Sequence, residues 1–164
     1  MSKVILITGA AGFIGFHSSL KFLRDDITVI GLDNINSYYD INLKKRRLKI
    51  LNETSLKEKK NWKFIKTDLT NKDQLLEVFQ EYKPEIVINL AAQAGVRYSI
   101  ENPVAYINSN ILGFQNILDC SVLNTVKHIL YASSSSVYGG NTNIPFSEIN
   151  SVNHPVSIYA ATKR

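Results

Sequence analysis

The segment Thr8–Gly15 carries three glycines at intervals of three residues, between an apolar run and an amphipathic stretch. The run has the composition of a buried parallel strand, and the spacing after the glycines predicts a helix over 13–24. Gly9 permits a tight turn, Gly12 lets the backbone approach a pyrophosphate, and Gly15 allows close helix–strand packing. This order of elements predicts a dinucleotide-binding unit. The alternative is a glycine-rich turn without a ligand, because the spacing is G-x-x-G-x-x-G rather than G-x-G-x-x-G.

A second strand is predicted over 27–32, and it ends at Asp33, about 20 residues after the glycine turn. A carboxylate at this point hydrogen-bonds the ribose hydroxyls of NAD and repels the additional phosphate of NADP. We therefore predict NAD as the cofactor, the alternative being an aspartate that caps a turn or a helix. Small residues at 91–95, after the fourth predicted strand, let the backbone lie against a flat cofactor.

Strands and helices alternate along the chain. Strands are predicted at 3–8, 27–32, 62–67, 84–91 and 127–133, and helices at 13–24, 40–52, 71–82, 103–124 and from 157 onward. This alternation predicts an α/β domain, a Rossmann-type doubly wound parallel sheet with helices on both faces. The carboxyl ends of the strands, and so the ligand, then lie at one edge. Two long loops are expected, 34–40 and 139–155, and the length of the second suggests a function.

A chain of 164 residues is long enough for one domain with a substantial core, and 45% hydrophobic residues is ordinary for a globular protein. Cys120 is the single cysteine, and its helical setting predicts a small core residue rather than a catalytic thiol. No apolar run is long enough to span a bilayer, and Met1–Lys3 lead directly into a strand, so we expect no signal peptide. These features predict a cytoplasmic protein with no membrane partner. No metal site is predicted.

The net charge of +5 is concentrated in one basic stretch between Lys44 and Lys63. Such a stretch can bind nucleic acid or an anionic membrane. No aromatic stacking platform accompanies it, and Leu43, Leu48 and Leu51 recur at helical spacing. We therefore favour a helix with one buried side and a solvated basic face, and we expect no nucleic-acid partner.

Tyr159 and Lys163 are four residues apart in the last predicted helix, so they share one face. An ammonium beside a phenol favours the phenolate, which gives a base usable near neutral pH. The spacing alone is weak evidence, because it occurs by chance in many helices. It gains weight from the glycine turn at the other end of the chain, and the pair is therefore the candidate catalytic base with its partner.

Polar residues follow two further strands of the predicted sheet. The run Ser133–Ser136 places four hydroxyls at the carboxyl end of the fifth strand, where they can bind a substrate hydroxyl or carbonyl. The alternative, above all for Ser135 and Ser136, is a polar turn. Asp68 and Leu69 follow the third strand, where an adenine edge can be read, and the alternative for Asp68 is a helix cap.

With these motifs the chain resembles the extended short-chain dehydrogenase/reductases, in the nucleotide-sugar epimerase branch, and within it the UDP-glucuronate 4-epimerases. The residues that carry the resemblance are Thr8–Gly15, Leu32–Asp40 with Leu43 and Lys44, Ala91–Ser99, Asn108–Gly113, Ser133–Gly139 and Pro155–Lys163. The first and last segments define the superfamily, whereas the segments around Asp33 and Gly95 narrow it to the glucuronate type. The resemblance covers essentially the whole chain, as the N-terminal half of such an enzyme.

The resemblance implies roles for individual residues. Catalysis is assigned to Tyr159 as the base, to Lys163 as its partner, and to Ser134, which hydrogen-bonds the reacting sugar hydroxyl. The implied cofactor-binding residues are Gly9, Gly12, Phe13, Ile14, Gly15, Asp33, Asn34, Asp68, Leu69, Leu90, Ala91, Ala92, Asn110, Tyr159 and Lys163. The implied substrate-binding residues are Arg97, Ser99, Ser134, Ser135 and Ser136.

The implied reaction is NAD-dependent epimerisation at C4 of a UDP-sugar, UDP-glucuronate to UDP-galacturonate, through a transient 4-keto sugar. The related sugar 4,6-dehydratases have Asp-Glu after the catalytic hydroxyl residue, whereas this chain has Ser135 and Ser136, which argues against dehydration. The alternatives are a UDP-N-acetylglucosamine 4-epimerase, a UDP-glucuronate decarboxylase and a non-catalytic NAD-binding protein. The Tyr–Lys pair argues against the last of these.

Chains of the resembled family continue with further strands and a smaller C-terminal domain that holds the UDP-sugar. The resemblance therefore implies that residues 1–164 form a truncated NAD-binding domain, incomplete at its C-terminus and without the substrate domain. We expect this fragment to be inactive and, because a sheet edge is left open, prone to self-association. For the full-length protein the resemblance implies a homodimer, with one interface helix at 103–124.

Overall fold

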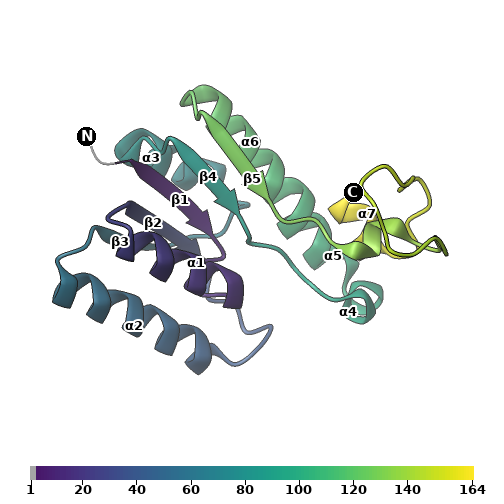
Figure 1. Ribbon diagram of the computed structural model, residues 1–164, viewed down its shortest axis with the longest axis horizontal. Coiled ribbons are helices and arrows are strands. Elements are labelled where there is room, and N and C mark those ends of the chain that lie inside the picture. The colour runs from purple at the N-terminus through teal and green to yellow at the C-terminus, as the bar shows by residue number, and fades with distance from the viewer. Residues whose placement is uncertain (1–2) are drawn as a thin grey trace.

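The computed structural model describes residues 3–164, which are built around a five-stranded sheet (Figure 1). The strands are β1 (Val4–Thr8), β2 (Thr28–Asp33), β3 (Trp62–Lys66), β4 (Ile86–Asn89) and β5 (His128–Tyr131). All pairings are parallel, and the order across the sheet is β3-β2-β1-β4-β5. The predicted doubly wound parallel sheet is therefore confirmed. The strand order reverses at β1, which places a ligand crevice at its carboxyl end.

Helices cover both faces of this sheet (Figure 1). One face packs against α1 (Phe13–Arg24) and α2 (Ile41–Glu58), and the other packs against α3 (Lys72–Tyr82) and α6 (Gly113–Leu123). Successive residues of β1 divide between the two layers. Leu6 belongs to the core cluster of α3 and α6, whereas Ile5 and Ile7 belong to the cluster of α1 and α2. Each face of the sheet thus has its own apolar core.

The remaining helical segments lie near the carboxyl ends of the strands (Figure 1). They are α4 (Val96–Glu101), α5 (Pro103–Tyr106), η1 (Ile107–Leu112), η2 (Ser135–Tyr138) and α7 (Ile158–Lys163). The helix predicted over 103–124 is present, but its middle is the π-helical segment η1. The sequence patterns did not predict α4, and Asn102 separates it from α5 by capping the amide of Ala105 at 3.3 Å.

The basic helix α2 differs from its prediction in length and in one side chain. It begins at Ile41, one residue later than predicted, because Asp40 is its cap: the Asp40 carboxylate accepts from the amide of Asn42 at 2.9 Å. It ends six residues later than predicted, at Glu58 before Lys59 in the left-handed conformation, instead of at 52. Lys45 lies on the solvated face as expected, but the expectation of a solvated side chain is wrong for Lys44, which is 4% exposed. Within residues 3–164, no helix combines the length and the apolar character needed to cross a bilayer.

A buried hydroxyl joins the central strand to the next one. The Oγ1 of Thr8 donates to Oδ1 of Asn89 at 2.7 Å, and it accepts from the amides of Leu90 and Ala91 at 3.1 and 3.0 Å. Thr8 is fully buried, so water cannot replace these partners. This hydroxyl therefore fixes how the chain leaves β4, directly beside the glycine turn.

We expect Thr8→Val to destabilise the fold by about 2–3 kcal/mol, because it keeps the shape of the side chain but leaves several buried polar groups unpaired. Urea unfolding monitored by circular dichroism measures this loss. The same substitution at the exposed Thr142 is the matched control and should change the free energy of unfolding by less than about 0.5 kcal/mol. Equal effects at the two sites would show that the Thr8 hydroxyl has no such role.

Candidate cofactor and catalytic site

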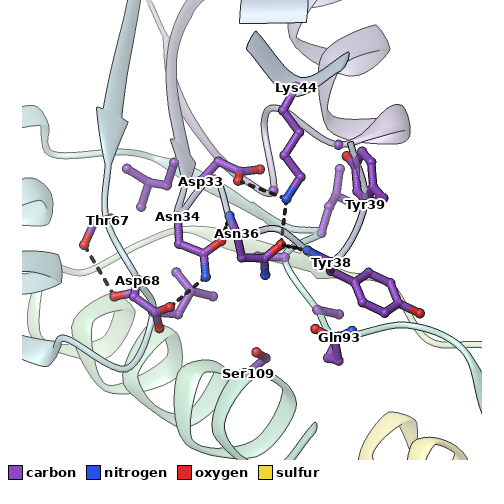
Figure 2. Close-up of a pocket in the computed structure, with 17 residues that line it drawn as sticks. Asp33, Asn34, Asn36, Tyr38, Tyr39, Lys44, Thr67, Asp68, Gln93 and Ser109 are labelled. Carbon is purple, nitrogen blue, oxygen red and sulfur yellow. Dashed lines mark hydrogen bonds and ion pairs between the residues drawn. The ribbon is translucent and has the colours of Figure 1, made fainter. Parts of the chain in front are cut away.

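A cavity opens at the carboxyl ends of β1, β2 and β4, where the strand order reverses (Figure 2). It is lined by Gly9, Gly12, Leu32, Asp33, Asn34, Asn36, Tyr38, Tyr39, Lys44, Thr67, Asp68, Leu69, Leu90, Ala91, Ala92, Gln93 and Ser109. Nine of these were predicted from the sequence as cofactor residues: Gly9, Gly12, Asp33, Asn34, Asp68, Leu69, Leu90, Ala91 and Ala92. The structure thus brings together residues from four separate segments of the chain.

The glycine turn forms the floor of this cavity. Gly9 has a φ of +68°, and a Cβ there would lie 2.8 Å from the amide nitrogen of Ala91. A Cβ at Gly15 would overlap the carbonyl oxygen of Gly9, so α1 can approach the turn only with glycine at this position. Gly12 caps α1 without a side-chain hydrogen bond, which leaves the amides of its first turn available to an anion. Phe13 and Ile14 form that first turn, and their side chains are exposed.

Asp33 ties the glycine turn to the loop that follows β2. Its carboxylate accepts from the amide of Ala11 at 3.1 Å and from the amide of Ile35 at 2.8 Å. The side chain is 8% exposed, and its nearest cation is the ammonium of Lys44 at 3.9 Å. Asp33 therefore shapes the cavity as well as presenting a carboxylate to it.

Lys44 is a cavity residue that sequence reasoning missed. Its ammonium donates to Oδ1 of Asn36 at 2.8 Å and lies 4.6 Å from the ring centre of Tyr39. Burial lowers the pKa of this lysine, and the nearby Asp33 carboxylate opposes the shift without cancelling it. A signal was present in the sequence, because position 44 shares a helix face with Leu48 and the buried Leu51.

Asp68 joins the loop after β3 to the loop after β2, on the cavity wall. Its carboxylate accepts from Nδ2 of Asn34 at 2.7 Å and from the amide and hydroxyl of Thr70 at 2.9 and 2.7 Å. Partial burial raises the pKa of Asp68, but the bonds from Asn34 and Thr70 outweigh it and bring the pKa below its ordinary value. The cap of α3 is Asn71, whose side chain accepts from the amide of Gln74 at 3.2 Å, so Asp68 is not that cap.

The predicted catalytic pair lies on α7, outside the lining of this cavity. Ser157 caps this helix through the amide of Ala160 at 3.0 Å. The ammonium of Lys163 donates to the carbonyl of Ala132 at 3.0 Å, just after β5, and burial lowers its pKa. Tyr159 is half-buried, with its ring centre 6.0 Å from that of the buried Tyr106 in an edge-on arrangement. These contacts fix the orientation of α7 against the end of β5.

The serine run forms a short 3₁₀ segment beside α7. Ser134 caps this segment, and its Oγ accepts from the amide of Ser136 at 3.2 Å. The Oγ of Ser133 donates to the carbonyl of Lys163 at 2.8 Å, while Ser135 is exposed. The predicted polar turn and the predicted row of hydroxyls therefore coexist in one segment.

Asn110 links the cavity to α7. Its Oδ1 accepts from the amide of Gln93 at 2.8 Å, and its Nδ2 donates to the carbonyl of Gln93 at 3.0 Å. The same Nδ2 lies 2.9 Å from Oγ1 of Thr162. None of the five predicted substrate residues lines this cavity: Ser134–Ser136 lie at η2, Arg97 is exposed on α4, and the buried Ser99 hydroxyl donates to the carbonyl of Val96 at 2.5 Å.

Further lining residues had not been predicted as ligand-binding, namely Leu32, Asn36, Tyr38, Tyr39, Thr67, Gln93 and Ser109. Three of them come from the loop 34–40, which was predicted as a long loop but was not given a function on account of its length. Gln93 lies in the segment 91–95 that was expected to face the cofactor, and Ser109 lies in the segment 108–113 that carries the resemblance, but neither residue had been assigned a role.

The parallel sheet, the glycine turn and the Tyr–Lys helix define a dinucleotide-binding domain of the short-chain dehydrogenase/reductase class. The sequence model of the family described as GDP-mannose 4,6 dehydratase matches residues 6–164, and the chain belongs to this family of extended short-chain dehydrogenase/reductases.

Among its relatives is Protein CapI of Staphylococcus aureus, which is 54% identical over 160 residues, covering 98% of this chain and 46% of the relative. UDP-glucuronate 4-epimerase 4 of Arabidopsis thaliana is 46% identical over 161 residues, covering 98% of this chain and 36% of the relative. The chain thus spans less than half of the length of these relatives.

A solved structure with the same fold is a mutant UDP-glucuronic acid 4-epimerase from Bacillus cereus, in complex with UDP-4-deoxy-4-fluoro-glucuronic acid and NAD. Its TM-score is 0.83 at 32% identity, and the match covers 98% of this chain and 48% of that chain. UDP-glucose 4-epimerase from Brucella ovis, in complex with NAD, has a TM-score of 0.81 at 26% identity, covering 99% and 45% of the two chains.

The lowered pKa of Lys44 gives a pH-dependent prediction. A lysine with a lowered native pKa binds fewer protons in the native than in the unfolded state, so it destabilises the fold below that pKa. This penalty disappears as the pH rises toward the ordinary value of 10.5. We expect the stability of the wild type relative to Lys44→Met to increase with pH in this window, in urea unfolding at successive pH values.

The matched control for this series is Lys45→Met, one residue along the same helix on the exposed face. Its difference from the wild type should stay constant over the same pH range. If the free energy of unfolding of the wild type relative to Lys44→Met stays constant or falls as the pH rises, the pKa of Lys44 is not lowered in the native state.

Proposed function

We propose that residues 1–164 are the NAD-binding part of a nucleotide-sugar 4-epimerase that interconverts UDP-glucuronate and UDP-galacturonate. Because the chain covers 46% or less of the relatives reported above, we further propose that the sugar-binding domain corresponds to their unmatched part. The observation that supports this function best is a direct contact between the cofactor cavity and the helix α7. Asn110 connects the wall of the cofactor cavity to the helix that carries Tyr159 and Lys163.

The cavity residues fit a dinucleotide. The turn at Gly9 and Gly12 leaves no room for side chains where a pyrophosphate requires the backbone, and the first turn of α1 offers free amides. Asp33 is a buried carboxylate at the end of β2, which suits ribose hydroxyls and disfavours a further phosphate. Asp68 and Leu69 form the wall expected to flank the adenine. These features support NAD rather than NADP.

The chemistry follows from the residues on α7 and η2. NAD, when bound, supplies a reversible hydride acceptor, which converts the carbinol at C4 of the sugar to a ketone and back. Tyr159 as phenolate takes the proton of the 4-hydroxyl and later returns it. Lys163, held by the carbonyl of Ala132, supplies the positive charge that favours this phenolate. Ser134 hydrogen-bonds the same sugar oxygen in both stages.

The reaction itself gives the first test. The purified gene product that contains this chain should convert UDP-glucuronate to UDP-galacturonate without added NAD, as followed by anion-exchange chromatography. Tyr159→Phe should reduce turnover by about 10²–10⁴-fold, the typical contribution of a general base, while the content of bound NAD stays the same. Residues 1–164 alone should not turn over the sugar.

The control is Tyr82→Phe, a loss of one phenol hydroxyl at the end of α3, away from the site. It should retain full activity. Retained activity in Tyr159→Phe would overturn the assignment of the base. Conversion of UDP-N-acetylglucosamine or UDP-glucose in place of UDP-glucuronate would keep the mechanism and overturn the substrate.

We also propose that the full-length protein is a homodimer. Apolar side chains stand exposed along the segment from α4 to η1, with Ile100 75%, Val104 60%, Ile107 47% and Ile111 51% exposed. Such a row is unusual on a monomeric surface and supports the helix-to-helix dimer that the resemblance implied.

In the full-length protein, the double substitution Val104→Glu and Ile111→Glu should shift the mass measured by light scattering from dimer to monomer. Charges at these positions would have to be buried without partners in the dimer. Ile149→Glu, in the loop 139–155 where the side chain is 92% exposed, is the control and should leave the dimer intact. A dimer that survives the double substitution would exclude this helix from the interface.

A further inference from the structure

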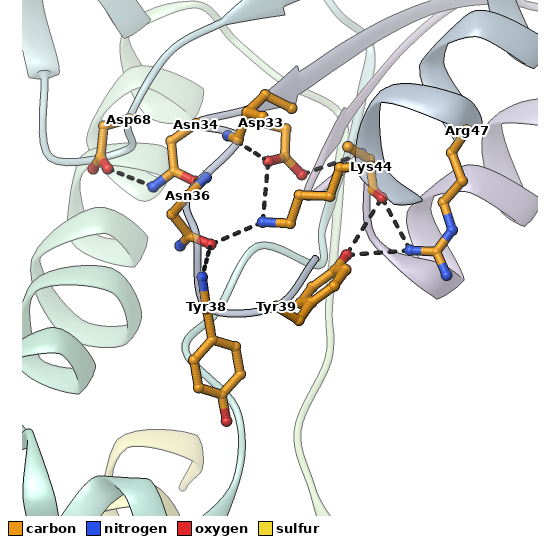
Figure 3. Close-up of polar contacts among 10 residues, drawn as sticks. Asp33, Asn34, Asn36, Tyr38, Tyr39, Lys44, Arg47 and Asp68 are labelled. Carbon is orange, nitrogen blue, oxygen red and sulfur yellow. Dashed lines mark hydrogen bonds and ion pairs between the residues drawn. The ribbon is translucent and has the colours of Figure 1, made fainter. Parts of the chain in front are cut away.

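The loop of residues 34–40, here called the cofactor loop, reaches across the cavity through one side chain. Tyr38 donates its hydroxyl hydrogen to the carbonyl of Ala94 at 2.7 Å, and its ring centre lies 5.2 Å from that of Tyr98. Figure 3 shows the ring of Tyr38 pointing away from the pair Asp33 and Lys44. Tyr38 therefore contacts the segment around Ala94, whereas Lys44 on α2 holds its own loop through Asn36.

The sheet order shows what this contact spans. The cofactor loop follows β2, and Ala94 lies in the segment that follows β4. The strand between them is β1, and the glycine turn stands at its carboxyl end. A bond from Tyr38 to Ala94 thus bridges the cavity from one side of the glycine turn to the other. Tyr38 lines the cavity, and so does Gln93, the chain neighbour of Ala94, so the bond lies at the edge of the cavity.

The acceptor side of the bridge is fixed. The hydroxyl of the fully buried Tyr106 lies 2.7 Å from the carbonyl oxygen of Ala94 and 2.6 Å from that of Gly95, so its one hydrogen is shared between these two acceptors. Burial raises the pKa of Tyr106 to about 12, so this hydroxyl remains a donor at all physiological pH values. The neighbouring Gln93 has both of its backbone groups bound by Asn110. The acceptor therefore has little freedom to move.

On the donor side of the bond, the cofactor loop is fixed near Asn34 and Asn36, whereas the side chain of Tyr38 can move. Asn36 is held by the ammonium of Lys44 at 2.8 Å, and Asn34 is held by Asp68 at 2.7 Å. The side chain of Tyr38, in contrast, is 43% exposed. Its hydroxyl bonds the carbonyl of Ala94 and also interacts with the hydroxyl of Tyr106, and its ring contacts that of Tyr98. Gly95 leaves space for it, since a Cβ there would lie 3.1 Å from the Tyr38 hydroxyl. The movable part of the bridge is thus one phenol ring.

We propose that the Tyr38–Ala94 hydrogen bond is a gate over the cofactor cavity, whose opening limits the rates at which the dinucleotide enters and leaves. The inference rests on the proposed use of NAD. Both partners of the bond belong to the protein, so the gate opposes entry and exit equally. An enzyme that regenerates its cofactor in every cycle benefits from slow exchange, because loss of the reduced form would leave the sugar as a ketone.

The test separates a gate from a simple binding contact. The gene product, freed of nucleotide, is mixed with NADH in a stopped-flow fluorimeter, and bound NADH is then displaced by excess NAD. Tyr38→Phe keeps the ring but removes the hydrogen bond, which is worth about fivefold in an opening equilibrium. Both the association and the dissociation rate should rise about fivefold, and Kd should change less than about twofold. Tyr38→Ala, which also removes the ring contact, should raise both rates further.

The matched control is Tyr98→Phe. It removes a hydroxyl from the ring beside Tyr38, where the partner is Nδ2 of Asn102 at 3.1 Å and the bond does not cross the cavity. Both NADH rates should remain within about twofold of the wild type, a difference far smaller than one lost hydrogen bond produces. Thermal unfolding of each variant shows whether it is folded, and the exposure of Tyr38 favours folding of its variants.

Each other outcome overturns a defined part of the argument. A rise in the dissociation rate alone, with a weaker Kd, would make Tyr38 a contact of the bound dinucleotide and overturn the gate. Unchanged rates in both Tyr38 variants would overturn it as well. A wild-type protein that does not bind NADH would overturn the gate and the proposed function together. Normal gating in a protein that leaves every UDP-sugar unchanged would overturn the proposed reaction and keep the gate.

Discussion

The contact on which the rest of this structure depends is the approach of backbone to backbone at the glycine turn. The carbonyl of Gly9 occupies the space that a side chain at position 15 would need, and the amide of Ala91 lies against Gly9 from the other side. Helix α1 and the end of strand β4 can therefore stand this close to the carboxyl end of β1 only because Gly9 and Gly15 have no side chains. The turn is also bound from β2 and α2, since Asp33 accepts from the amide of Ala11 and Arg47 donates to the carbonyl of Ala11 at 3.2 Å. The backbone of the glycine turn thus determines the shape of the cavity at the end of β1 and the position at which α1 begins.

The second constraint is the connection between the glycine turn at the base of the cavity and α7, which carries the proposed catalytic pair. Asn110 lies in the π-helical segment η1, which interrupts a helix that otherwise continues from 103 to 123. Its side chain binds both backbone groups of Gln93 in the cavity wall and also contacts Thr162 on α7. π-Helical turns are rare and often mark functional positions, because they redirect side chains that a regular helix would place elsewhere. Here the π-helical segment η1 contains Asn110, the residue whose side chain contacts both the cavity wall and α7. The site is therefore held by the packing of helices behind it as well as by the loops around it.

Local patterns predicted those features that local physics determines. The apolar runs, the glycine spacing and Asp33 gave the sheet and the cavity floor, because the strands are buried on both faces and the turn tolerates few residues. Lys44 was misjudged, since a lysine in a basic stretch is normally solvated, whereas here Asn36 and Asp33 receive its ammonium. The partner of Tyr38 could not be foreseen, because Ala94 is 56 residues away and meets it only after the sheet has formed. The same holds for α4, whose short sequence has no periodic pattern strong enough to distinguish it from a loop.

The family description names a dehydratase, yet the residues at the end of β5 favour a different reaction. Elimination of water from a sugar requires an acid that can protonate the departing hydroxyl, and a carboxyl group near the catalytic hydroxyl residue is suited to this. This chain has Ser135 and Ser136 in those positions, one exposed and the other hydrogen-bonded within η2. Serine hydroxyls can orient a sugar oxygen, but they do not release a proton at neutral pH. What remains is the proposed base on α7 and a row of neutral hydrogen-bonding groups, which suits the removal and return of a proton at one carbinol. Since such a cycle consumes neither acid nor cofactor, the proposed slow exchange of the cofactor and the serines at positions 135 and 136 both fit the proposed epimerisation.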